Sequence, residues 1–164
     1  MSGAVAGSVF ASPNSNQVKA LIEAVGGGSG NNPVLVIAKQ YTGDVLLFGR
    51  AVERINAKST SGSPSAKLLI VGEDVSVPPD QITLVGKRGL AATVLVYKIA
   101  GAAAQLSHPL DSCYNLAKYV GESSFTLGVG LDHCQWVQQE CCGITLTSPY
   151  SPTAFQALNN QIHI

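Results

Sequence analysis

The sequence has few charged and few aromatic residues, and its opposite charges cancel. Only 12% of the 164 residues are charged and 6% are aromatic, whereas 46% are hydrophobic. Ten basic residues offset ten acidic residues, so the formal net charge at pH 7 is zero. Without a block of like charge, there is no electrostatic basis for binding nucleic acid or an anionic membrane surface. The length and the apolar fraction predict one folded domain and exclude a disordered chain.

The sequence also lacks a long, uninterrupted hydrophobic run. The most apolar stretch, residues 89–106, contains Lys98 and many glycine and alanine residues, so it does not predict a transmembrane helix. Residues 1–13 have no basic region and no long apolar core, which argues against a signal peptide. We therefore expect a cytoplasmic protein that does not associate with membranes.

Cysteine is scarce, and its spacing matches no disulfide framework. Cys113, Cys134, Cys141 and Cys142 are expected to be reduced thiols, because no secretory signal precedes them. His133 lies beside Cys134, but zinc ligands are usually paired across a few intervening residues. The adjacent Cys141 and Cys142 do not easily hold one ion. We therefore predict no metal site.

The first part of the chain begins with a helical pattern. Ser12 is suited to cap this helix, with Pro13 at its first position. The glycine-rich residues 26–30 end the helix. A phosphate-binding loop would follow a strand and precede a helix, whereas this run has the reverse order. The run is therefore interpreted as a helix end and a connector.

Two short, apolar and β-branched stretches, residues 34–38 and 67–71, are typical of strands buried on both faces. A helical pattern between Val45 and Ile55 separates them, with its charges outside the apolar stripe. The order strand, helix, strand predicts a right-handed crossover and a largely parallel sheet.

The second part of the chain is less regular. Residues 82–106 combine β-branched and alanine-rich sequence, and periodicity does not decide between strand and helix. A helix is expected at residues 110–120 and a last strand at residues 125–131. Residues 135–164 are expected to form an irregular tail, with at most a short turn at residues 154–158.

Residues 39–44 (KQYTGD) are the best candidate for a binding site. They follow the first expected strand, at the sheet edge where ligands bind in open α/β folds. Gly43 would allow an unusual backbone angle and the close approach of a ligand. Lys39 supplies a donor and Asp44 an acceptor, a pair suited to a small polyol or carbonyl compound. The commoner explanation is structural, with Asp44 as a helix N-cap and Lys39 as a solvated charge.

Successive blocks of the sequence resemble the substrate-binding domain of the dihydroxyacetone (glycerone) kinase family. The blocks are residues 4–13 (AVAGSVFASP), 34–49 (VLVIAKQYTGDVLLFG), 69–75 (LIVGEDV), 86–102 (GKRGLAATVLVYKIAGA) and 125–134 (FTLGVGLDHC). Their order and spacing match over about residues 1–134, which we expect to be a partial substrate-binding domain. The resemblance implies a three-layer α/β fold, with helices on both faces of a largely parallel or mixed sheet. It also implies that residues 86–102 are largely helical.

The resemblance implies that the chain binds dihydroxyacetone for ATP-dependent phosphorylation to dihydroxyacetone phosphate. In the family, the lysine and the aspartate of a K-x-Y-T-G-D motif bind the substrate hydroxyls. These positions are Lys39 and Asp44 here, and Asp44 would also help to deprotonate the attacking hydroxyl. Gln40, Ala92 and Tyr97 stand where the family usually has asparagine, glycine and histidine.

Several parts of the family pattern have no match in this sequence. Neither the glycine-rich G-x-G-H-E motif nor the G-I-H-x-E-x-G motif of the covalent histidine is present, and His108, His133 and His163 have no matching role. The family's ATP-binding domain, which holds magnesium, is also unmatched, so we expect no cofactor in this chain. The sequence predicts an incomplete form that is inactive alone. A non-catalytic fragment that forms a homodimer or pairs with a full-length kinase, or a product without a stable fold, are the alternatives.

Overall fold

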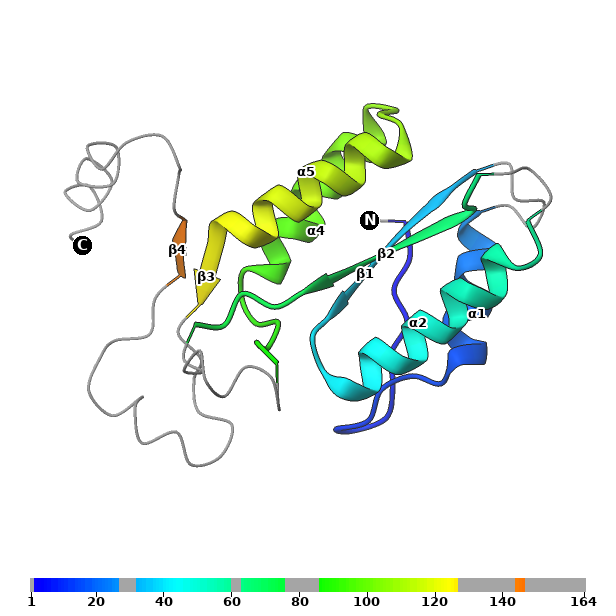
Figure 1. Ribbon diagram of the computed structural model, residues 1–164, viewed down its shortest axis with the longest axis horizontal. Coiled ribbons are helices and arrows are strands. Elements are labelled where there is room, and N and C mark those ends of the chain that lie inside the picture. The colour runs from blue at the N-terminus through cyan, green and yellow to red at the C-terminus, as the bar shows by residue number, and fades with distance from the viewer. Residues whose placement is uncertain (1, 27–31, 60–62, 76–85, 127–143, 147–164) are drawn as a thin grey trace.

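The computed structural model describes residues 2–26, 32–59, 63–75, 86–126 and 144–146. In chain order the helices and strands are α1 (Ser15–Val25), β1 (Val34–Lys39), α2 (Thr42–Asn56), β2 (Ala66–Val71), α4 (Thr93–Gln105), α5 (Leu110–Ser123), β3 (Ser124–Thr126) and β4 (Ile144–Leu146). Among the described residues, helices and strands alternate from α1 to β2, and two consecutive helices and two short strands follow (Figure 1). None of the described helices combines the length and the apolarity needed to span a membrane.

Strands β1 and β2 are parallel, as the sequence predicts, and pair from Val34 opposite Ala66 to Lys39 opposite Val71. Beyond β2, an isolated parallel bridge joins Asp74 to Thr126 of β3. Strand β3 in turn pairs with β4 in antiparallel orientation. The mixed α/β class is therefore confirmed.

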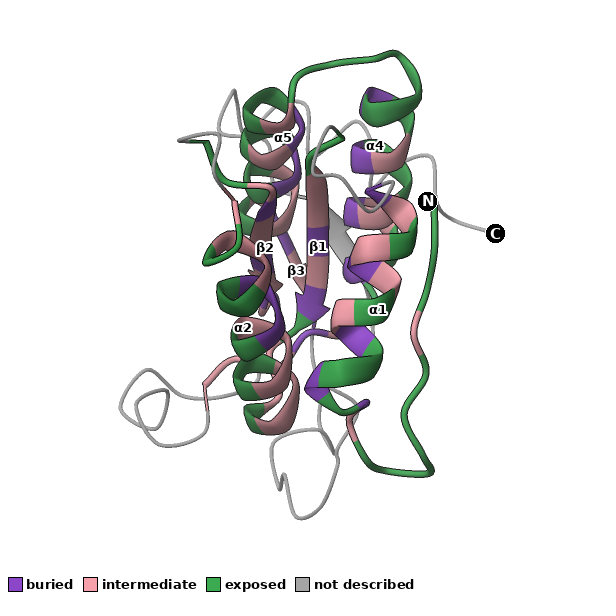
Figure 2. Cartoon of the chain, turned by 90° about the vertical axis from the view of Figure 1, so that its right-hand side faces the viewer, coloured by how far each residue is buried: buried purple, intermediate pink, exposed green. Residues whose placement is uncertain are grey.

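Helices cover both faces of the β1–β2 pair. Figure 1 shows α1 and α2 on one side of these strands and α4 and α5 on the other. Alternate residues of β1 point to opposite faces, so Val34 and Val36 pack against the α1–α2 side, and Leu35 and Ile37 pack against the α4–α5 side. Figure 2 shows buried residues along the helix faces that are turned toward the sheet. This three-layer arrangement agrees with the expected fold.

The start of α1 differs from the prediction. The N-cap is Asn14 rather than Ser12, and the helix begins at Ser15, so Pro13 precedes the helix instead of opening it. The Asn14 side chain accepts hydrogen bonds from the backbone N–H groups of Asn16 and Gln17 at 3.0 Å each. The Gln17 side chain accepts the N–H of Asn14 at 2.9 Å. This reciprocal capping box satisfies more N–H groups than a lone serine could.

The later elements match the prediction only in part. The helix expected in residues 86–102 forms but begins at Thr93. The last strand is shorter than expected, with β3 at Ser124–Thr126, and residues 127–131 lie outside the described residues. Strand β4 lies within residues 135–164, where no strand was expected, and the rest of that tail lies outside the described residues. Three residues are too few for periodicity to reveal a strand. The turn expected at residues 154–158 lies outside the described residues.

Candidate functional site

Lys39 and Asp44 line the same groove, at the carboxyl end of β1. The groove has a volume of about 1590 Å³ and lies between β1, the N-terminal segment (residues 2–13) and parts of α1, α2 and α4. Lys39 is the last residue of β1 and is exposed, whereas Asp44 is half-buried in α2. The structure therefore brings the two predicted site residues together at the expected edge of the sheet.

Asp44 is not the N-cap of α2, so that structural explanation of the residue is wrong. The cap position is Tyr41, whose extended backbone makes no side-chain capping bond. The helix already begins at Thr42, and the N–H of Val45 bonds to the carbonyl of Tyr41 at 2.9 Å. Asp44 therefore lies inside the first turn, where the helix dipole favours a negative charge.

The prediction for Gly43 is wrong about its backbone. It is an ordinary helical residue of α2, and the one described glycine with positive φ is Gly86, at 67°. A Cβ atom at Gly43 would lie only 2.7 Å from the hydroxyl oxygen of Ser12. The missing side chain thus allows the N-terminal segment to approach α2, and Gly43 also lines the groove.

The side chains of Lys39 and Asp44 are available to a ligand. Within the ranges that the structure describes, neither side chain has a hydrogen bond or an ion pair with another protein group. An ammonium and a carboxylate at one groove offer both donors and acceptors. Hydroxyl groups can both donate and accept hydrogen bonds, so the chemistry of this pair is compatible with such groups.

A glycine-containing loop, residues 86–92, lies over the ends of β1 and β2. A Cβ atom at Gly89 would clash with the carbonyl oxygen of Val71 and would lie 2.9 Å from the Cβ of Lys39. At Gly86, a Cβ atom would clash with the side-chain amide of Gln40. Glycine therefore lets this loop pack directly against the ends of β1 and β2, where Lys39 lies.

Glu73 holds this loop in place from the end of β2. Its Oε1 accepts the backbone N–H of Leu90 at 2.6 Å, the N–H of Ala92 at 3.0 Å and the hydroxyl of Thr126 at 3.3 Å. Only 3% of Glu73 is exposed. The buried carboxylate therefore ties three segments together and lies at the N-terminus of α4, where the helix dipole stabilises it.

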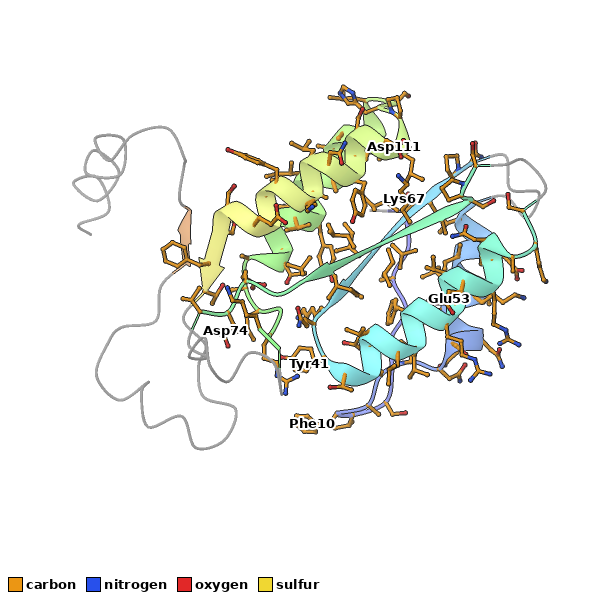
Figure 3. All side chains as sticks on the ribbon, viewed as in Figure 1. Phe10, Tyr41, Glu53, Lys67, Asp74 and Asp111 are labelled. Carbon is orange, nitrogen blue, oxygen red and sulfur yellow. The ribbon has the colours of Figure 1, made fainter. Side chains whose placement is uncertain are left out.

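Two further contacts join the loop to its surroundings. The N–H of Asp74 donates to the carbonyl of Arg88 at 3.0 Å. The Arg88 guanidinium lies 5.0 Å from the centre of the Tyr41 ring, within the range of a cation–π interaction. Figure 3 shows Tyr41 and Asp74 near one end of the strands, and Lys67 with its ion-pair partner Asp111 at the other. The loop is therefore joined both to the residues after β2 and, through Arg88, to Tyr41 at the start of α2.

Tyr97 is a groove residue that the sequence did not single out for a role. It is half-buried on α4 and lines the same groove as Lys39 and Asp44. Burial, and then the negative charges of Asp44 and Glu73, raise the pKa of the Tyr97 phenol above its usual value of 10.0. Like an ordinary tyrosine, Tyr97 is protonated at neutral pH and can donate a hydrogen bond. Glu73 could have been found from the sequence, because it follows β2 just as Lys39 ends β1. The sequence around Tyr97 contains no signal that indicates a role in the groove.

Of the other sequence candidates that the structure describes, Cys113 lines the groove and His108 does not. His108 is exposed between α4 and α5, where its carbonyl accepts the thiol of Cys113 at 3.5 Å. His133, Cys134, Cys141, Cys142 and His163 lie outside the described residues. Among the residues that are described, no group of three or more histidine, cysteine, aspartate or glutamate side chains could hold a metal ion.

Comparison with known protein families gives a match over most of the chain. A family model described as the Dak1 domain matches residues 1–149, past residue 134, where the resemblance was expected to stop. Dihydroxyacetone kinase 2 of Saccharomyces cerevisiae is 45% identical over 129 residues, which are 79% of this chain and 21% of the yeast protein. The dihydroxyacetone-binding subunit of the PEP-dependent dihydroxyacetone kinase of Escherichia coli is 34% identical over 134 residues, 82% of this chain and 35% of that subunit.

Solved structures give the same result. The crystal structure of the dihydroxyacetone kinase of C. freundii matches with a TM-score of 0.62 and 37% identity, over 86% of this chain and 24% of that chain. A structure concerning the regulation of the dha operon of Lactococcus lactis matches with a TM-score of 0.59 and 30% identity, over 76% of this chain and 37% of that chain. The chain therefore spans between about a fifth and about two fifths of the length of these proteins.

Proposed function

The chain belongs to the dihydroxyacetone kinase family as a Dak1 domain, and on this premise we propose that its groove binds dihydroxyacetone or a closely related triose. One observation carries the proposal. The lysine and the aspartate of the K-x-Y-T-G-D motif, Lys39 and Asp44, line one groove and make no side-chain bond within the described residues. The name of the Escherichia coli relative, a dihydroxyacetone-binding subunit, supports the choice of ligand.

The chemistry of the two side chains gives each a distinct role. The Lys39 ammonium donates to one hydroxyl oxygen, and the Asp44 carboxylate accepts the proton of the other hydroxyl. Phosphoryl transfer depends mainly on an oriented nucleophile and on stabilised charge. Asp44 would therefore orient the attacking hydroxyl and serve as its general base in an intact kinase.

We propose that these 164 residues alone bind the triose without phosphorylating it. The sequence carries neither the covalent-histidine motif nor a nucleotide-binding motif of the family. ATP and magnesium would act through parts of the longer relatives that this chain does not match. We also propose a cytoplasmic location, as the sequence predicts.

An amide nitrogen–proton NMR titration with millimolar dihydroxyacetone tests triose binding. We expect shifts in residues 39–44 of the wild-type chain. Asp44→Ala should abolish these shifts without unfolding the chain, because Asp44 caps no helix. Asp111→Ala is the matched control, since Asp111 also lies in the first turn of a helix, α5, but outside the groove. Unchanged binding in Asp44→Ala would refute the proposed role of the groove.

A second function, a non-catalytic or regulatory module that pairs with a full-length kinase or forms a homodimer, has one observation in its favour. The matching Lactococcus lactis structure concerns regulation of an operon rather than phosphoryl transfer. Light scattering of the chain, alone and mixed with an intact kinase of the family, distinguishes the two functions. A stable complex without any triose-dependent shift would favour the module.

A further inference from the structure

We propose that Tyr97 is a third ligand-contacting residue of the groove, whose phenol hydroxyl donates a hydrogen bond to the carbonyl oxygen of the triose. This inference rests on the proposed function. Lys39 and Asp44 account for the two hydroxyl groups of dihydroxyacetone. The remaining oxygen is a carbonyl, which can only accept a hydrogen bond, so it requires a further donor.

The position of Tyr97 on α4 suits this role. Residues spaced by three or four positions share one face of a helix. Tyr97, Ala100 and Ala104 form such a row, and all three line the groove. The two alanines contribute only methyl groups, so Tyr97 and Gln105 are the polar residues of α4 that line the groove. Of these two, Tyr97 is the one that senses the charge of Asp44.

The hydroxyl of Tyr97 is both protonated and uncommitted. Burial and the nearby charges of Asp44 and Glu73 disfavour loss of its proton. Within the described part of the chain, the hydroxyl has no hydrogen-bond partner. Tyrosine also has few side-chain torsions to lose when it binds a ligand.

Buried polar groups lie on the same side of α4 as Tyr97. Thr93, one turn earlier on this helix, is fully buried, and its hydroxyl has no hydrogen-bond partner among the described residues. The Oε2 atom of Glu73 is likewise buried without a described partner. Buried polar atoms are normally bonded, but neither Thr93 nor Glu73 lines the groove. Tyr97 is therefore the member of this group that a ligand in the groove can reach.

Tyr97→Phe tests the inference because it removes only the hydroxyl. Tyr114→Phe is the matched control: Tyr114 is also half-buried, but it lies on α5, 5.5 Å from the Lys67 ammonium, and does not line the groove. The dissociation constant for dihydroxyacetone is measured by NMR titration of each chain. We expect Tyr97→Phe to raise this constant by about five- to tenfold, the usual effect of one lost hydrogen bond, and Tyr114→Phe to leave it unchanged.

A second substitution separates the hydroxyl from the ring. Tyr97→His restores a hydrogen-bond donor on a smaller ring, so we expect it to recover part of the affinity that Tyr97→Phe loses. If Tyr97→Phe binds as well as wild type, or if the histidine variant binds no better than the phenylalanine variant, the inference is overturned. If the wild-type and Tyr114→Phe chains both fail to bind dihydroxyacetone, the proposed function itself fails.

Discussion

Glu73 offers the most direct test of how the groove is held together. Its Oε1 atom accepts the backbone N–H groups of Leu90 and Ala92, and these two bonds fix the loop of residues 86–92 over the ends of β1 and β2. The loop in turn contacts Lys39 through Gly89. Loss of the carboxylate should therefore lower the stability of the fold and displace a residue of the proposed site.

The size of the effect follows from the burial of Glu73. Glu73→Ala leaves two N–H groups without their acceptor at a position that is only 3% exposed. Each unsatisfied buried group costs about 1–3 kcal/mol, so we expect a loss of about 3 kcal/mol or more in the free energy of unfolding. Glu73→Gln keeps a carbonyl acceptor and loses only the charge, which should cost about 1 kcal/mol.

Urea denaturation followed by circular dichroism measures these losses. With a slope of about 2 kcal/mol per molar urea, Glu73→Ala should lower the midpoint by about 1.5 M. Glu53→Ala is the control, because Glu53 is exposed on α2 and should change stability by less than about 0.5 kcal/mol. If Glu73→Ala has the wild-type urea midpoint, or if the alanine and glutamine variants lose the same free energy of unfolding, Glu73 does not hold the loop of residues 86–92 in place.

Further substitutions test the backbone features that shape the site. Asn14→Ala should lower the free energy of unfolding by about 1 kcal/mol, because it removes the capping box of α1. Ser12→Ala should lower it clearly less. Equal losses of stability in thermal unfolding would contradict the assignment of Asn14 as the N-cap. Gly86→Ala should destabilise the chain by at least about 1 kcal/mol, because φ is 67° and the new methyl would clash with Gln40. Gly49→Ala, in the middle of α2 with no atom within 4 Å of the added Cβ, should instead stabilise it by about 0.5–1 kcal/mol. If the urea midpoint moves in the same direction for both glycine variants, the backbone conformation of these glycines does not determine the effect on stability.

The sequence predicts the central frame well because that frame depends on local periodicity. Residues 34–38 and 67–71 are apolar throughout, and both form strands that are buried between helix layers. The helical stripe from Val45 to Ile55 lies within α2. The order of these elements also predicts which strand ends meet, and Lys39 and Asp44 are found at that edge.

Features that depend on contacts between distant segments were missed or wrongly predicted. Two polar residues could cap α1, and only the reciprocal bonds of Asn14 and Gln17 decide between them. Ser12 packs closely against Gly43, and the two residues are far apart in the sequence. The local sequence around Gly43 therefore could not reveal this contact. Strand β4 is likewise defined by its pairing with β3 rather than by its own composition.

The same distinction explains why the site was only half predicted. Lys39 and Asp44 belong to one short motif, whereas Glu73 follows β2 and Tyr97 lies in the second turn of α4. Glu73 binds the backbone of the loop that packs against Lys39, and Tyr97 lines the groove itself. Substitutions at Tyr97 should therefore change the affinity for the ligand without changing the fold, and substitutions at Glu73 should change the affinity and the stability together. The contrast between these two positions separates residues that support the site from residues that contact its ligand.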